Sequence, residues 1–284
     1  NVEYITNPSK NYEILFQSLI KPRKALRKWL RKKELTIIPS STLCYEHDYR
    51  FQRSDTSNPY HDFIESQYGI SVATSSVHIN LGIDNLQKLF SAFRLARCEA
   101  PLYLAISASS PFLNGKFTGN HSQRWIQFPK TPREVPFFAD HDQYISWIGE
   151  SIKNGNMHNI RHFWSSIRPN GPNRPYELNR LELRICDFIS DIDLLLSVTA
   201  LLELRTLFLF QNINNMDHIL CSKFSNYDLA AICDQNELRV AKNSLNAELI
   251  YWKDGQLIMC KDWIKKILNE ISPISVQLNM QDLL

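Results

Sequence analysis

Residues 167–187 read IRPNGPNRPYELNRLELRICD, and the end of this stretch alternates between apolar and polar side chains. Leu181, Leu183 and Ile185 form the apolar set. The set between them is mostly charged and comprises Arg180, Glu182, Arg184 and Cys186. A period of two predicts a β-strand that follows a turn-rich loop, with an apolar back and a charged front. The alternation is equally typical of an ordinary half-buried strand whose charged face is solvated.

A second stretch, residues 77–83, shows the same alternation. Its apolar set is Val77, Ile79, Leu81 and Ile83, and its other face carries His78, Asn80 and Gly82. Val2 and Tyr4 flank Glu3 in the same way, which predicts a third strand near the start of the chain. Three strands could present Glu3, His78 and Glu182 to one cleft. Oxygen ligands with one imidazole suit Mg²⁺ or Mn²⁺ better than zinc, although a lone histidine on a strand is usually structural.

The composition bounds the class of protein. The 284 residues are 44% hydrophobic, which is enough to form a full core in one large domain or in two. The formal charge of +3 is too small to indicate a dedicated nucleic-acid-binding protein. The sequence contains neither a run of eighteen apolar residues nor a signal peptide, and its six cysteines lack CxxC spacing. We therefore expect a cytoplasmic protein with reduced thiols that binds neither nucleic acid nor membranes.

A basic helix is expected near the start of the chain. Residues 21–33 hold eight Lys or Arg side chains around the apolar set Leu26, Trp29 and Leu30. Contact with RNA or a membrane is one interpretation of this pattern. A solvated amphipathic helix is the interpretation that the local charge and the balanced chain favour.

Further helices are expected along the chain. Asp84 can cap one that ends near Pro101, and Asp191 or Asp193 can cap a central buried helix. Residues 225–250 are interpreted as a helical pair, and polar loops are expected at 53–60 and 114–124. The glycine-rich nucleotide-binding motifs GxGxxG and GxxxxGK[ST] are absent from the sequence, which excludes a Rossmann or P-loop nucleotide site.

Several blocks of sequence together resemble one family. They are NVEYIT at 1–6, RSDTSNPYHDFIE at 53–65, SSVHINLGI at 75–83, LAISASSPFLNGKFTGNHSQR at 104–124, WSSIRPNG at 164–171, NRLELRICD at 179–187 and NAELIYWKDGQ at 246–256. These blocks resemble the glutamate–cysteine ligases of cyanobacterial type, within the carboxylate–amine ligases. The resemblance implies an α+β protein of the glutamine-synthetase-like fold, with one catalytic domain over 1–284. In that fold an antiparallel sheet has a concave active face and helices cover its back.

The resemblance also implies a reaction and its partners. ATP would phosphorylate the γ-carboxylate of glutamate, and the amine of cysteine would then attack, with Mg²⁺ or Mn²⁺ aligning the phosphates. The implied metal ligands are Glu3, His78 and Glu182. Arg184 is the implied contact for the transferring phosphoryl group, Arg124 and Arg168 are implied for substrate carboxylate, and Asn80 is implied for substrate. A different amine acceptor and a non-catalytic binding domain remain alternatives.

The first residue is Asn1, and a strand-like segment follows at once. The family resemblance implies further acidic metal ligands on an upstream strand. We therefore expect that the natural chain has one or more strands before Asn1 and that residues 1–284 lack part of the metal site.

Overall fold

The alternation in residues 180–183 corresponds to the central strand of a small antiparallel sheet. The computed structural model describes residues 2–46, 55–68, 73–170 and 179–284. Its sheet has the order β1 (Ile79–Gly82), β5 (Arg180–Leu183) and β4 (Ile167–Asn170), with both outer strands antiparallel to β5. The turn-rich loop expected before β5 falls largely on residues 171–178, outside the described residues.

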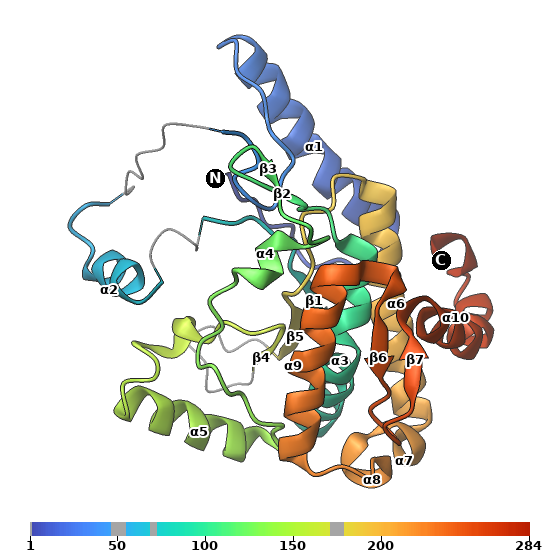
Figure 1. Ribbon diagram of the computed structural model, residues 1–284. Coiled ribbons are helices and arrows are strands. Elements are labelled where there is room, and N and C mark those ends of the chain that lie inside the picture. Colours follow the sequence, from blue (N-terminus) through green and yellow to red (C-terminus); the bar gives the residue numbers. More distant parts are fainter. Residues whose placement is uncertain (1, 47–54, 69–72, 171–178) are drawn as a thin grey trace.

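One face of this sheet is apolar and packs against a long helix. Ile79, Ile167, Leu181 and Leu183 are all buried there. The helix is α3 (Leu86–Ser107), whose residues are buried almost without interruption from Leu89 onward. Figure 1 shows α3 beside the strands of this sheet. The side chains that alternate with the apolar set point to the opposite face, which can therefore carry polar groups.

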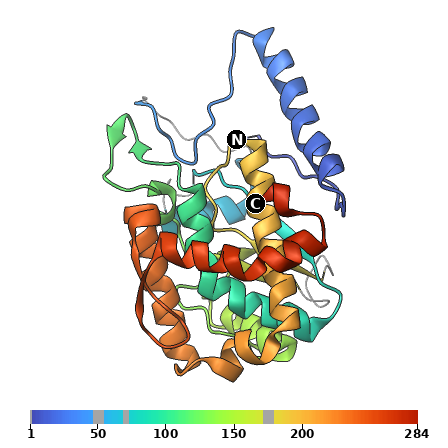
Figure 2. The same ribbon diagram turned by 90° about the vertical axis from the view of Figure 1, so that its right-hand side faces the viewer.

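Three further helices complete the core around α3. They are α6 (Ile192–Gln211), α9 (Asn226–Asn243) and α10 (Cys260–Gln277), each of which contacts α3. The view in Figure 2 shows α10 crossing in front of α3 and α6. The α6 helix is apolar on nearly all sides and begins at the N-cap Asp191, whose side chain accepts from the amides of Asp193 and Leu194. The predicted central buried helix is therefore confirmed.

The remaining elements are short or peripheral. They are α2 (Pro59–Tyr68), β2 (Phe112–Leu113), β3 (Lys116–Phe117), α4 (Gln123–Ile126), α5 (His141–Lys153), η2 (Ile160–His162), α7 (Ile213–Met216), α8 (His218–Cys221), η3 (Ser244–Asn246), β6 (Glu248–Ile250), β7 (Leu257–Met259) and η4 (Gln281–Leu283). The result is an α+β protein, as predicted.

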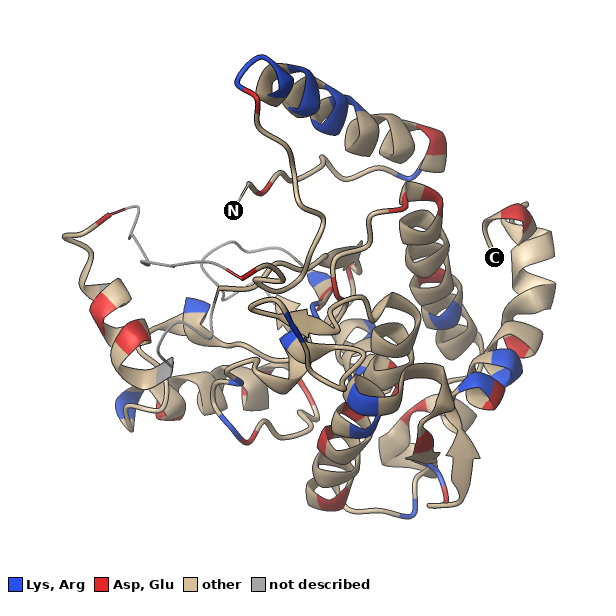
Figure 3. Ribbon diagram, turned by 45° about the horizontal axis from the view of Figure 1, so that its top comes forward, with Lys and Arg blue, Asp and Glu red and all other residues tan. Residues whose placement is uncertain are grey.

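The predicted basic helix is α1 (Tyr12–Arg31), which runs through Pro22 and buries none of its residues. Its N-terminal half lies against α6, while the end rich in Lys and Arg stands away from the rest of the molecule (Figure 3). Trp29 at this end is 56% exposed. The amphipathic helix is thus confirmed, and its basic side chains are exposed except for Arg23, which donates to the Ser190 carbonyl oxygen.

Some predicted boundaries are wrong for local reasons. Asn85, not Asp84, caps α3, because the Asn85 side chain accepts from the Lys88 amide. The helix also continues past Pro101 to Ser107, since helical packing on the sheet outweighs the lost hydrogen bond. Residues 225–250 hold one helix, a 3₁₀ turn and the strand β6 instead of a helical pair. The polar loop expected at 53–60 begins outside the described residues and ends where α2 starts at Pro59.

The strand predicted around Glu3 is also wrong. Residues 2–9 form no regular structure, and Glu3 is exposed. The hydroxyl of Tyr4 donates to the carbonyl oxygen of Leu19 at 3.0 Å, so the segment lies along α1 instead of pairing with the sheet.

Two further expectations bear on the chain's environment. All six cysteines are free thiols, and four of them are buried. Among the described residues, none of the helices combines the length and the apolar character that a membrane crossing would require.

A buried histidine makes the stability dependent on pH. His218 is 2% exposed, and its Nε2 lies 3.0 Å from Asn226 Oδ1. Burial, with a smaller contribution from Arg94, lowers the pKa of His218 to about 4 against its hydrogen bond to Asn226 Oδ1, which raises it. The folded pKa lies below the unfolded value of about 6.5, so the unfolded chain binds the proton first as pH falls. The stability that neutral His218 contributes is complete above pH 6.5 and is lost as pH falls towards 4.

We expect the free energy of unfolding to fall between pH 6.5 and 4, by at most about 1.4 kcal/mol per pH unit for this group. Urea unfolding at several pH values, followed by circular dichroism, measures the slope. His218→Gln should reduce the slope, whereas the exposed His121→Gln should leave it unchanged. Equal slopes for His218→Gln and the wild type would contradict the expectation.

Candidate active site

The register of the sheet places three of the predicted site residues in one row. Asn80 lies opposite Glu182 across the β1–β5 pair, and Arg168 lies opposite Glu182 across the β4–β5 pair. All three side chains therefore emerge on the face away from α3. We call this surface, together with His78 and Arg184 beside the row, the polar face.

Glu182 is the centre of the polar face. Its Oε2 accepts a hydrogen bond from Arg168 Nε at 2.7 Å and lies 2.7 Å from Arg168 Nη2 in the same ion pair. Its Oε1 accepts from Arg184 Nη1 at 2.9 Å and lies 3.5 Å from His78 Nδ1. His78 Nε2 in turn lies 3.0 Å from Ser76 Oγ. One carboxylate therefore orients two guanidinium groups and an imidazole.

This arrangement sets the charge of each group. Burial would raise the pKa of Glu182, but Arg184 and Arg168 outweigh it and lower that pKa to about 2. Burial, followed by the nearby charge of Arg168, lowers the pKa of Arg184 to about 10 against the opposing effect of Glu182. Burial and the charge of Arg184 lower the pKa of His78 to about 3. At neutral pH the groups in contact with Glu182 therefore comprise two guanidinium groups and a neutral imidazole around one carboxylate.

Glu182 differs from the sequence expectation in one respect. The alternation predicts a carboxylate on an open face, whereas Glu182 is only 4% exposed. Arg168 and Arg184, each with a side chain 12% exposed, cover it. The carboxylate supports the arginines, and the arginines are the groups that a ligand would meet first.

The predicted three-ligand metal site is not assembled by the described residues. Glu3 is exposed on the segment beside α1, whereas His78 and Glu182 lie together on the sheet. Across 2–46, 55–68, 73–170 and 179–284, no three His, Cys, Asp or Glu side chains lie close enough together to hold a metal ion. Both oxygens of Glu182 also accept from arginines. These donors do not fit a divalent cation held by three protein ligands.

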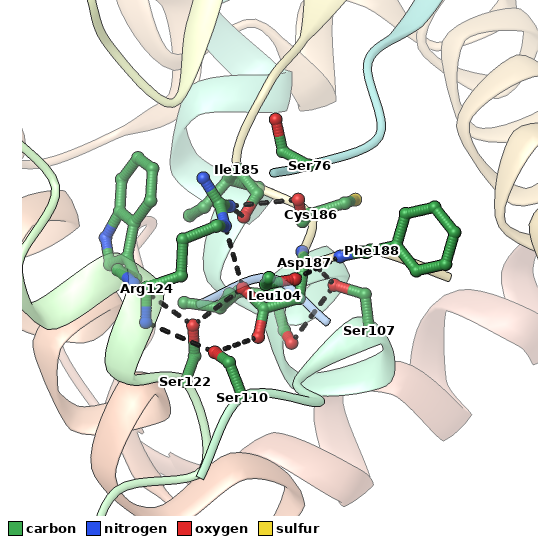
Figure 4. A network of polar contacts seen from close by, with 12 residues as sticks. Ser76, Leu104, Ser107, Ser110, Ser122, Arg124, Ile185, Cys186, Asp187 and Phe188 are labelled. Atoms are coloured by element: carbon green, nitrogen blue, oxygen red, sulfur yellow. Dashed lines mark hydrogen bonds and ion pairs between the residues drawn. The ribbon is translucent and has the colours of Figure 1, made fainter. Parts of the chain in front are cut away.

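Arg124 is neither a surface residue nor a member of the polar face. It is 1% exposed on α4, and its Nε donates to Asp187 Oδ1 at 2.8 Å (Figure 4). Its Nη2 donates to the carbonyl oxygens of Ile185 and Cys186. Arg124 therefore binds the chain just beyond β5, and this placement does not support the predicted contact with substrate. Its charge still lowers the pKa of His78 and of Arg184.

Asp187 is the partner that sequence reasoning missed. Besides Arg124, its fully buried carboxylate accepts from Ser122 Oγ at 2.8 Å, Ser110 Oγ at 2.7 Å and the Ser109 amide at 3.0 Å. These donors all come from residues 109–124, a stretch that includes the polar loop expected at 114–124, in which β3 and the start of α4 interrupt the irregular structure. Asp187 thus ties this loop to the end of β5. The only sequence signal was an acidic residue directly after the alternating run.

A second row crosses the polar face two residues away from Glu182. Asn170 lies opposite Arg180, which lies opposite Gly82. These residues have the same strand parity as Arg168, Glu182 and Asn80, so they share the polar face. Sequence reasoning assigned no role to Asn170 or Arg180.

Relatives of this chain were found by sequence. A protein of Thermobifida fusca, provisionally named a glutamate–cysteine ligase 2, is 26% identical over 235 residues, which cover 81% of this chain and 56% of the relative. A relative from Rhodococcus jostii, provisionally named a glutamate–cysteine ligase 2-2, is 28% identical over 235 residues, which cover 78% of this chain and 58% of the relative. The chain thus spans just over half the length of these relatives.

Two solved structures share the fold. The bifunctional glutathione synthetase of Pasteurella multocida superposes with a TM-score of 0.63 at 15% identity, covering 98% of this chain and 41% of that one. The glutamate–cysteine ligase of Francisella tularensis, solved in complex with AMP, gives a TM-score of 0.58 at 14% identity, and the match covers 78% of this chain and 57% of that one. At such identities the likeness shows the fold, which is that of these ligases, as predicted. The family model for glutamate–cysteine ligase family 2 (GCS2) matches residues 1–284, and the chain therefore belongs to that family.

Proposed function

We propose that this chain is one catalytic domain of an ATP-dependent carboxylate–amine ligase that joins the γ-carboxylate of glutamate to the amine of cysteine. The observation that carries the proposal is the polar face, where Glu182 holds the guanidinium groups of Arg168 and Arg184 side by side. The family match over the whole chain supports it. The acceptor amine is assigned as cysteine because the relatives' provisional names carry that substrate.

The reaction needs two transfers. An oxygen of the γ-carboxylate attacks the terminal phosphorus of ATP, and the bond to ADP breaks, which leaves an acyl phosphate. The cysteine amine then attacks the acyl carbon, phosphate leaves, and the nitrogen loses a proton. Both transfers bring anionic groups together, so positive charge must be held in place before the reaction begins.

The two arginines supply that charge in an oriented form. Arg184 is proposed to contact the transferring phosphoryl group, and Arg168 to contact substrate carboxylate. Planar guanidinium groups donate two parallel hydrogen bonds to either kind of oxygen pair. Glu182 keeps both forks oriented, and a cluster of two positive charges around one negative charge leaves a net attraction for anions.

Two neighbours have smaller proposed roles. Asn80 is exposed at the end of the row and is proposed to donate its amide to substrate. His78 is neutral at pH 7 and lies 3.4 Å from Arg184 Nη1, so it limits the directions in which that guanidinium can turn.

An ADP-release assay tests the proposed function. The protein is mixed with ATP, glutamate and a panel of amines, and the product is identified by its mass. We expect ADP release that requires both glutamate and cysteine, with γ-glutamylcysteine as the product. Turnover with a different amine would assign another ligase of the family. If the protein neither binds ATP nor releases ADP, a non-catalytic binding domain is favoured.

Arg184→Lys tests the phosphoryl contact. Lysine keeps the charge but loses the planar fork, so kcat should fall by about 10- to 100-fold while KM for glutamate changes little. Steady-state ADP release at saturating ATP measures both constants. Arg239→Lys on α9, where Arg239 Nη1 donates to the Glu248 carbonyl oxygen, is the matched control and should retain the wild-type constants. A normal kcat for Arg184→Lys would remove Arg184 from the mechanism.

A further inference from the structure

The second row of the polar face holds polar groups without partners. Asn170 is 0% exposed, and neither its side-chain nitrogen nor its oxygen has a hydrogen-bond partner. The Nε of Arg180 opposite it is likewise buried without a partner. Leaving a buried amide unpaired costs free energy, and native proteins seldom do so without a functional reason. Groups of a ligand are the natural partners for this pair.

Room for a ligand exists on the same row. Gly82 faces Arg180 in the register, and a side-chain carbon placed on Gly82 would meet no atom within 4 Å. The space above this end of β1 is therefore not filled by the protein. Asn170, on β4, lies at the other end of the row.

The two side chains recognise complementary charges. A guanidinium group donates paired hydrogen bonds to a carboxylate, and the amide nitrogen of asparagine can add another. The amide oxygen of asparagine accepts from an ammonium group. Together, Asn170 and Arg180 match the α-carboxylate and α-ammonium groups of an amino acid. We infer that this row is the subsite for the α-amino acid end of the carboxylate substrate, an inference that rests on the proposed function.

The spacing of the rows fits glutamate. Two residues along an antiparallel strand span about 7 Å, so the Asn170–Arg180 row lies that far from the Arg168–Glu182 row. The two carboxyl carbons of extended glutamate, four bonds apart, are separated by about 5 Å, and hydrogen bonds to Arg168 bridge the rest. Aspartate is one bond shorter and reaches less far. Glutamate held at the second row therefore presents its γ-carboxylate to the arginines of the first.

Three ligands separate the contributions of the α-groups. Glutamate has both groups, 4-aminobutyrate lacks the α-carboxylate, and glutarate lacks the ammonium. Dissociation constants for each are measured by isothermal titration on the wild type, Arg180→Met and Asn170→Ala. We expect Arg180→Met to raise the dissociation constant of glutamate by about 10- to 100-fold and to leave that of 4-aminobutyrate unchanged. Asn170→Ala should weaken the binding of glutamate more than the binding of glutarate.

The control and the contrary results are equally specific. Arg239→Met, which removes a half-buried arginine on α9 whose Nη1 donates to the Glu248 carbonyl oxygen, should bind all three ligands as the wild type does. Equal losses of glutamate and 4-aminobutyrate in Arg180→Met would show a general structural effect and overturn the subsite. Unchanged glutamate affinity in Arg180→Met, with ligase turnover retained, would overturn the subsite alone. A wild type that binds none of the three ligands and releases no ADP would overturn the proposed function with it.

Discussion

Asp187→Asn is expected to lower the free energy of unfolding by about 3–5 kcal/mol, the usual cost of breaking a buried ion pair. The Asp187 carboxylate is fully buried and accepts four hydrogen bonds, one of them from Arg124. Asparagine would turn one acceptor into a donor that faces other donors, and Arg124 would keep an uncompensated buried charge. Urea unfolding followed by circular dichroism measures the change.

Two further variants identify the cause. Asp234→Asn removes a carboxylate whose side chain is 38% exposed and which lies 3.1 Å from Lys130 Nζ, so it should cost less than about 1 kcal/mol. Adding Arg124→Met to Asp187→Asn should restore part of the lost stability, because it removes the unpaired charge. If Asp187→Asn unfolds at the same urea concentration as the wild type, the network of Figure 4 is not a stabilising one.

Glu182→Gln is expected to reduce ligase turnover by on the order of 10³-fold, comparable to removing a main electrostatic contact from an active site. Without the negative charge, Arg168 and Arg184 repel each other, and neither fork is held in its orientation. Because Glu182 is buried and paired, the variant should also lose stability. Steady-state ADP release, at a temperature where near-ultraviolet circular dichroism shows the variant to be folded, measures the effect on turnover alone.

A matched carboxylate provides the control for Glu182→Gln. Glu203 accepts from the Tyr12 hydroxyl at 2.7 Å on α6, away from the sheet, so Glu203→Gln should retain wild-type turnover. Turnover within about threefold of the wild type for Glu182→Gln would show that its charge does not organise the polar face.

The alternation of side chains was sufficient to predict the polar face. A strand period of two assigns Glu182 and Arg184 to one face of β5, and it assigns His78 and Asn80 to one face of the neighbouring strand. The structure brings these side chains together with Arg168. Local periodicity suffices here because all of these residues lie on or directly beside short strands, where covalent geometry dictates the direction of each side chain.

Contacts between distant segments were decided by the tertiary structure. The pattern around Glu3 is also alternating, yet that segment lies along α1, where the Tyr4 hydroxyl donates to the Leu19 carbonyl oxygen, and it pairs with none of the described strands. Arg124 was predicted at a ligand and instead binds Asp187, which is 63 residues away in the chain. Nothing in the sequence near Arg124 indicates which carboxylate it meets.

The sequence by itself determined the α+β class, the central buried helix and the shared face of Glu182 and Arg184 and of His78 and Asn80, because each depends on periodicity over a few residues. The tertiary structure alone decided that Glu182 is covered by arginines, that Asp187 anchors the 109–124 loop and that Asn170 lies opposite Arg180. The last of these depends on strand register. Register and burial arise from packing between segments far apart in the chain, and such long-range contacts leave no local period in the sequence.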